Sequence, residues 1–133
     1  MASILKVDDL RGNTAAGNIT ITSEGGAVTQ SLQQGLLKYW NNWDGTGTIA
    51  SRDSLNASAL VDSGAGLYTN KITNPFRAAE QAMTGQAGNY CYTTQSSSYA
   101  VTTTQFYTYV VRYNTTTYTD ANGVFSTASG DLA

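Results

Sequence analysis

The chain has 133 residues, which suits one compact domain, and a formal net charge of −2 with no histidine. Charged residues make up only 12% of it and form no basic stripe, so binding to nucleic acid is not expected. The single cysteine, Cys91, excludes an intrachain disulfide framework, and neither a membrane-spanning apolar run nor a secretion signal is recognisable.

Residues 1–31 form a first zone that is too small to build a core of its own. A short apolar run, Ile4–Val7, is followed by polar sequence, and Asn18–Thr22 alternates apolar and polar residues before the turn signal Ser23–Gly26. We expect one strand or hairpin arm within an extended N-terminal segment that serves docking or assembly.

Residues 32–133 are expected to form the folded domain. Turn signals recur roughly every ten residues, with short runs rich in β-branched and aromatic residues between them, as is typical of a sandwich or barrel. The turn signals are Asp44–Gly47 and Asp62–Gly66, and the runs are Thr48–Ser54, Ala59–Val61 and Leu67–Thr73.

The third zone of the chain begins at its only proline, Pro75, where the helix-forming stretch Phe76–Met83 predicts one short helix. Three strands are predicted after it, at about Gly88–Thr94, Ala100–Asn114 and Thr116–Ser126. The middle strand carries bulky side chains on both faces, so we expect cover on both sides, the second from a neighbouring subunit. The predicted fold is all-β: an antiparallel, jelly-roll-like β-sandwich with at most one short helix.

The stretch Lys38–Asn56, KYWNNWDGTGTIASRDSLN, resembles a recurrent module in tail-fibre and other virion proteins of marine tailed bacteriophages. In that family a Trp and a second aromatic residue precede an Asx-Gly-Thr-Gly turn, and the next strand ends in Arg-Asp-Ser. Asp62–Thr69 matches the continuation, and both ends of the chain, Met1–Asp8 and Gly130–Ala133, look like those of such proteins. One departure is Asn70, where the resemblance predicts valine.

The resemblance implies a β-sandwich on the surface of a phage particle, often as a homotrimer. We therefore expect a non-catalytic virion structural protein, either a tail fibre or other appendage or a capsid decoration. Its partners would be copies of itself and other virion proteins, and it would be made in the cytoplasm of the host bacterium. The alternative is a receptor- or glycan-binding module of the same particle.

Four residues are candidates for contact with a glycan or another subunit: Tyr39, Trp40, Asn42 and Trp43. Exposed aromatic rings can stack on sugar rings, and amides can both donate to and accept from sugar hydroxyls. In the competing interpretation one or both tryptophans fill the core or a subunit interface. The Tyr/Thr-rich stretch 99–119 has the same two interpretations, as strand surface first and as receptor-facing surface second.

Catalysis, cofactors and metals have little support in the sequence. Without histidine there is no imidazole base, and Asp44, Asp53 and Asp62 each lie beside a turn or strand end, where Asp caps backbone N–H groups. Calcium at Asp44 with Thr46 or Asp62 is the alternative, although no loop has the acidic density of a calcium motif. We predict no catalytic residue, no cofactor and no metal site.

Overall fold

The computed structural model describes residues 4–15, 18–22, 25–26, 28–88, 91–94 and 100–133. Strands account for 52% of the chain and helix for 3%, which confirms the predicted all-β class. The chain forms two compact units, Met1–Leu36 and Leu37–Ala133, whereas the sequence had suggested a boundary after residue 31. In the part of the chain that is described, no helix has the length and apolar character needed to span a bilayer.

The first unit contains the hairpin arm that the alternation at residues 18–22 predicted. Strand β1 (Thr20–Thr22) pairs antiparallel with β2 (Thr29–Ser31), and the short helix α1 (Leu32–Gly35) follows directly. An isolated hairpin of this size is marginally stable in water, so this unit depends on further contacts.

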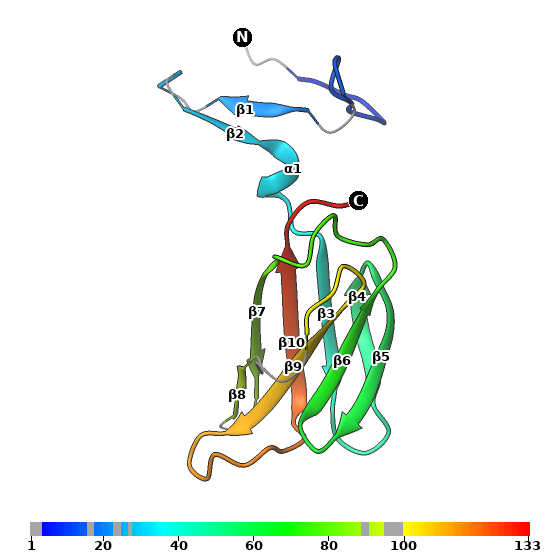
Figure 1. The fold of residues 1–133 in the computed structure, drawn as a ribbon, viewed down its shortest axis with the longest axis vertical. Coiled ribbons are helices and arrows are strands. Elements are labelled where there is room, and N and C mark those ends of the chain that lie inside the picture. Colours follow the sequence, from blue (N-terminus) through cyan, green and yellow to red (C-terminus); the bar gives the residue numbers. More distant parts are fainter. Residues whose placement is uncertain (1–3, 16–17, 23–24, 27, 89–90, 95–99) are drawn as a thin grey trace. The chain divides into compact units, whose positions relative to one another are not determined.

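The second unit is a sandwich of two antiparallel four-stranded sheets (Figure 1). The first sheet has the order β4-β3-β10-β7 and the second the order β5-β6-β9-β8. Consecutive strands pair within one sheet at β3–β4, β5–β6 and β8–β9, so the order does not by itself establish the expected jelly-roll likeness. The strands are β3 (Tyr39–Asp44), β4 (Ala50–Leu55), β5 (Ala57–Gly64), β6 (Leu67–Ile72), β7 (Ala82–Ala87), β8 (Cys91–Thr94), β9 (Gln105–Arg112) and β10 (Asn122–Ser129).

The core has two apolar clusters with a polar layer between them. Each of the four central strands turns one polar residue inward between two apolar ones, so the polar residues meet halfway along the sandwich. The inward triplets are Tyr39-Asn41-Trp43 on β3, Tyr68-Asn70-Ile72 on β6, Phe106-Thr108-Val110 on β9 and Val124-Ser126-Ala128 on β10.

Strand β9 is covered on both faces, as its bulky residues predicted. On its outer face Tyr109 and Val111 are each only 5% exposed. The segment that leads to β10 lies over them: Tyr118 forms a bridge with Val111, and its ring centroid is 5.2 Å from that of Tyr109. The chain itself therefore supplies here the cover that was expected from a neighbouring subunit.

The helix predicted at Phe76–Met83 is wrong, because this stretch is irregular until β7 begins at Ala82. Phe76 is buried in the core, and its N–H donates to the carbonyl of Thr103 at 2.8 Å. The N–H of Arg77 donates to the carbonyl of Asp131, also at 2.8 Å. A helix this short is only marginally stable by itself, so these tertiary hydrogen bonds determine the conformation of the segment instead.

The later strands are displaced from their predicted bounds. The stretch Ala100–Asn114 contains β9, and Thr116–Ser126 is mostly loop, since β10 starts only at Asn122. The predicted strand Gly88–Thr94 overlaps β8, while its residues 89–90 lie outside the described residues.

Candidate binding surface

Strand β3 carries all four candidate contact residues and divides them between two sides. Because side chains alternate along a strand, Tyr39 and Trp43 point into the sandwich, where both are 0% exposed. Trp40 and Asn42 lie on the opposite side and are half-buried. The Trp43 ring meets the edge of Tyr68 with centroids 5.6 Å apart. The folded chain can thus offer only Trp40 and Asn42 to a partner, and the two tryptophans form no common stacking surface.

Asn70 is the centre of the buried polar layer. Its Oδ1 accepts hydrogen bonds from Tyr39 Oη at 2.9 Å and Ser126 Oγ at 3.3 Å, and its amide donates to Thr108 Oγ1 at 2.9 Å. Burial raises the pKa of Tyr39 to about 12, with smaller opposing effects of the nearby Asn41 amide and Ser126 hydroxyl. Asn41, equally buried, has no hydrogen-bond partner within the described structure for either of its side-chain polar atoms.

Asp44 and Asp62 cap backbone N–H groups beside turns, as their sequence neighbours predicted, whereas Asp53 lies within β4. Asp44 Oδ1 accepts the N–H of Thr46 at 2.9 Å and its hydroxyl at 2.6 Å, and Arg52 lies 3.1 Å from Oδ2. The Thr46 hydrogen bonds, followed by the charge of Arg52, lower the pKa of the Asp44 carboxyl. Asp53 accepts the N–H of Ser54. Asp62 in turn accepts the N–H of Gly64 at 3.0 Å. No three acidic, cysteine or histidine side chains gather into a possible metal site among the described residues.

The sandwich has a base and a tip. The base consists of residues 37–38, where the unit begins, the β6–β7 connection and the C-terminal residues 130–133. The tip, at the bottom of Figure 1, consists of the turns after β3, β5 and β9: residues 45–49, 65–66 and 113–121. Asp120 ties the tip together, because its Oδ1 accepts the N–H of Gly66 at 2.8 Å and the hydroxyl of Tyr68 at 2.9 Å.

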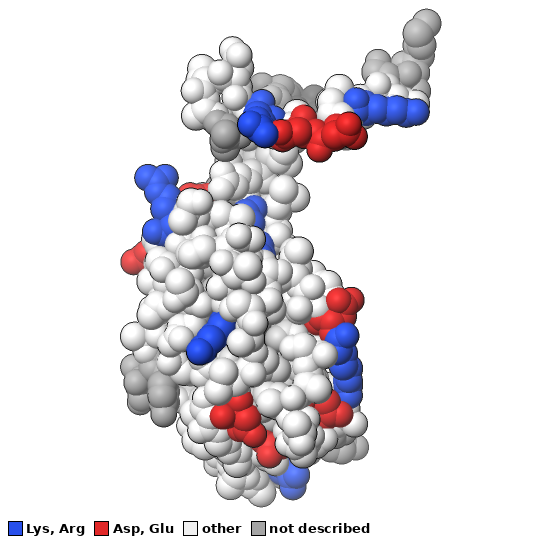
Figure 2. Space-filling model, turned by 90° about the vertical axis from the view of Figure 1, so that its right-hand side faces the viewer, with Lys and Arg blue, Asp and Glu red and all other residues white. Residues whose placement is uncertain are grey.

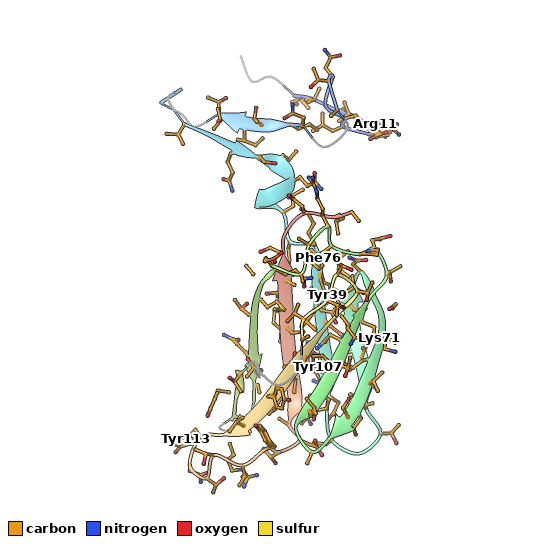
Figure 3. All side chains as sticks on the ribbon, in the orientation of Figure 1. Arg11, Tyr39, Lys71, Phe76, Tyr107 and Tyr113 are labelled. Carbon is orange, nitrogen blue, oxygen red and sulfur yellow. The ribbon has the colours of Figure 1, made fainter. Side chains whose placement is uncertain are left out.

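Tyrosines gather on the outer side of the second sheet and at the tip; we call this set the tyrosine face. Tyr92 lies opposite Val111 in the β8–β9 register and therefore on the same side as Tyr109. Figure 3 places Tyr107 on β9 and Tyr113 at the tip. Tyr113 is 64%, Tyr118 56% and Tyr92 45% exposed. The members of the tyrosine face are Tyr92, Tyr107, Tyr109, Tyr113 and Tyr118.

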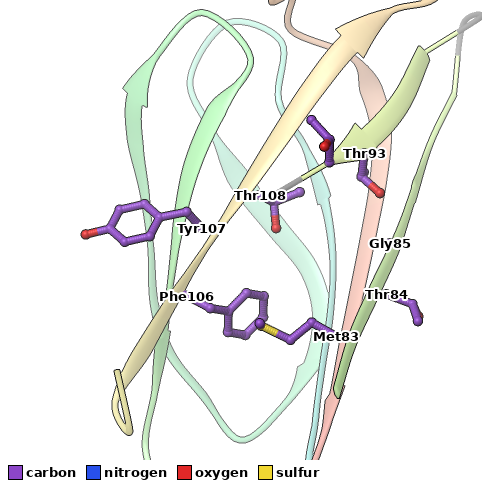
Figure 4. A pocket seen from close by; sticks show the side chains of 8 residues that line it. Met83, Thr84, Gly85, Thr93, Phe106, Tyr107 and Thr108 are labelled. Atoms are coloured by element: carbon purple, nitrogen blue, oxygen red, sulfur yellow. The ribbon is translucent and has the colours of Figure 1, made fainter. Parts of the chain in front are cut away.

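A groove of about 340 Å³ opens between β7 of the first sheet and β8 and β9 of the second (Figure 4). In the close-up Phe106 and Met83 reach toward each other across it, whereas Tyr107 points away. Its lining is uncharged, so it suits water or a small neutral group. The lining residues are Met83, Thr84, Gly85, Thr93, Thr94, Phe106, Tyr107 and Thr108. No sequence motif predicted this groove, since its residues come from three separate strands.

Charge is sparse on the sandwich, and the face seen in Figure 2 shows isolated acidic and basic side chains without a continuous patch of either sign. No protein-family model, no curated protein and no solved structure matches the chain.

Proposed function

We propose that the chain is a non-catalytic structural module on the surface of a bacteriophage particle, a tail appendage or head decoration that acts through oligomeric assembly. The phage context comes from the sequence resemblance at Lys38–Asn56. The observation that carries the proposal is that the two ends of the sandwich differ. The first and last residues of the unit lie at the base, whereas the tip consists of turns between strands.

Backbone hydrogen bonds hold the first and last residues of the unit at the base. The N–H of Lys38 donates to the carbonyl of Ala128 at 3.1 Å, and the N–H of Ala133 donates to the carbonyl of Pro75 at 2.9 Å. Leu132 also forms a bridge with Phe76. Neither the first nor the last residue of the unit therefore lies at the tip.

The first unit supports assembly because it leaves apolar side chains in water. Ile4 is 79% and Leu5 76% exposed, and Val7 and Leu10 are at least half exposed. Exposed apolar area costs roughly 25 cal/mol per Å², and clustered apolar groups commonly mark protein contacts. Burial of this run in a homotrimer, or against another virion protein, would remove that cost.

Light scattering on the full-length protein tests the assembly. We expect three times the 14.1 kDa of one chain, and dissociation when Ile4 and Leu5 are both replaced by aspartate. Leu55→Asp is the matched control, because Leu55 is 46% exposed on the edge strand β4 and lies outside the first unit. A monomeric full-length protein would contradict the proposal.

The particle itself provides the second test. An epitope inserted after Gly47 extends a tip turn in which an added Cβ would meet no atom within 4 Å. Gold-labelled antibody should then decorate intact phage particles and show whether tail or head carries the module. Purified particles that contain no copy of the chain would refute the phage assignment.

The alternative function, binding of a receptor or glycan, is favoured by one specific observation: the tyrosine face carries exposed rings at the tip. Binding of a receptor or glycan at the tip requires no change of fold, and it is compatible with assembly through the first unit.

A further inference from the structure

The loop between β9 and β10 combines exposed aromatic rings with neutral polar side chains. From Tyr113 to Thr119 it reads Tyr-Asn-Thr-Thr-Thr-Tyr-Thr, without an ionisable group other than the two phenols. The next residue, Asp120, is already engaged inside the fold by Gly66 and Tyr68. Tyr and Asn are also enriched in antibody binding loops, where Tyr supplies contact area at low entropic cost and Asn supplies adaptable hydrogen bonds.

The loop is held in one conformation by its own backbone. The N–H of Thr116 donates to the carbonyl of Arg112 at 2.9 Å, and the N–H of Arg112 donates to the carbonyl of Thr117 at 3.0 Å. The N–H of Thr119 donates to the carbonyl of Val110 at 3.1 Å. Thr116 has a φ of 52°, a left-handed conformation that is uncommon for a β-branched residue.

These contacts order the backbone that carries the two exposed rings. The Tyr118 ring in addition packs against that of Tyr109, with ring planes inclined at 45°. A pre-ordered loop avoids much of the entropy loss that binding otherwise imposes. Strain at Thr116 is also typical of sites where the surrounding structure imposes a functional geometry.

We infer that the tip of the tyrosine face, centred on Tyr113 and Tyr118, binds a neutral polysaccharide. A phenol ring offers an apolar face to the C–H side of a sugar and a hydroxyl at its edge. Threonine hydroxyls and the Asn114 amide can both donate to and accept from sugar hydroxyls. Residues 113–119 themselves carry no charge that could pair with an acidic polymer, and the exposed Arg112 lies directly before them.

This inference rests on the alternative function, for which it names the ligand class, and it is separate from the proposed assembly, so each can fail alone. Assembly depends on Ile4 and Leu5 in the first unit, whereas sugar binding depends on residues at the tip. Loss of trimerisation would leave monovalent sugar binding intact, and loss of sugar binding would leave the trimer intact.

Affinity electrophoresis of the full-length protein through gels that contain dextran, mannan, galactan or acidic alginate tests the inference. We expect at least one neutral polymer to retard migration. Tyr113→Ala should weaken that retardation at least tenfold and Tyr113→Phe much less, because the ring is retained. Phe125→Ala, at a 38% exposed ring on β10 of the other sheet, should change nothing. Melting curves confirm that each variant is folded.

Three outcomes would overturn the inference. The first is that no neutral polymer retards the protein, and the second is that alginate alone does so. The third is that Tyr113→Ala leaves sugar binding unchanged but alters the mass in light scattering, which would make the tip a contact between copies.

Discussion

Two buried asparagines offer a matched test of the polar layer. Asn41 and Asn70 are both 0% exposed and both point inward from a central strand, but only Asn70 is hydrogen-bonded through its side chain. Replacing each by valine removes the same amide in the same core. We expect Asn70→Val to destabilise the sandwich and Asn41→Val to be neutral or slightly stabilising.

The magnitude follows from the hydrogen bonds that each amide makes. Asn70→Val leaves the hydroxyls of Tyr39 and Ser126 without their acceptor and that of Thr108 without its donor. At about 1 kcal/mol for each lost bond the cost is about 3 kcal/mol. The added apolar side chain returns about 1 kcal/mol. The net loss of about 2 kcal/mol lowers the melting temperature by about 10 °C in a domain of this size.

Urea unfolding of the two variants, followed by tryptophan fluorescence, measures the difference. Tyr39→Phe combined with Asn70→Val should recover about 1 kcal/mol, because it removes one of the stranded hydroxyls. Equal stability changes for the two valine variants would refute the account of the layer.

Three further predictions concern alkaline pH, the tip and added reagents. Burial raises the pKa of Tyr39 to about 12 from the value of about 10 expected in the unfolded chain. The contribution of the neutral Tyr39 phenol to the free energy of unfolding should therefore be fully present below about pH 10 and be lost as the pH rises toward 12. The melting temperature of Tyr39→Phe should fall less steeply over this range. Gly66→Ala should lower the free energy of unfolding in urea by more than 2 kcal/mol, because its Cβ would lie 2.5 Å from Val110 O and Thr119 N. Gly47→Ala has the same φ of 64° but open space around the added Cβ, so it should lower this free energy by only about 1 kcal/mol. EDTA or a reductant should leave the melting temperature unchanged, since the sequence has no histidine and one cysteine.

Local chemistry accounts for the parts of the fold that the sequence predicted. Leu67–Thr73 alternates apolar and polar residues and Thr48–Ser54 follows a turn signal, and they became β6 and β4 with small changes of boundary. The turns after Asp44 and Asp62 formed because each carboxylate accepts an N–H two residues later. Signals of this kind involve only a few neighbouring residues, so they predict the local structure without knowledge of the tertiary contacts.

Strands β3 and β7 were not predicted because their patterns conflict with the usual rules. On β3 a polar residue, Asn41, faces the core and an aromatic one, Trp40, faces outward, which obscures the alternation. The sequence of β7, Ala-Met-Thr-Gly-Gln-Ala, has little β-propensity, and its pairing with β10 makes it a strand. Alternation of side chains along β3 explains why the four candidate residues, close together in sequence, do not share a surface.

Asn70 connects the sequence with the architecture. The resemblance predicts valine there, and a valine would make none of the side-chain hydrogen bonds that link β6 to the other sheet. With asparagine, the hydrogen bonds to Tyr39 and Ser126 of the first sheet form only when the two sheets are correctly aligned. A shift of one residue in β6 would turn Asn70 outward and leave both hydroxyls buried without an acceptor. The layer therefore favours a single alignment of the sheets, and with it the fixed tip geometry on which the binding of a sugar polymer would depend.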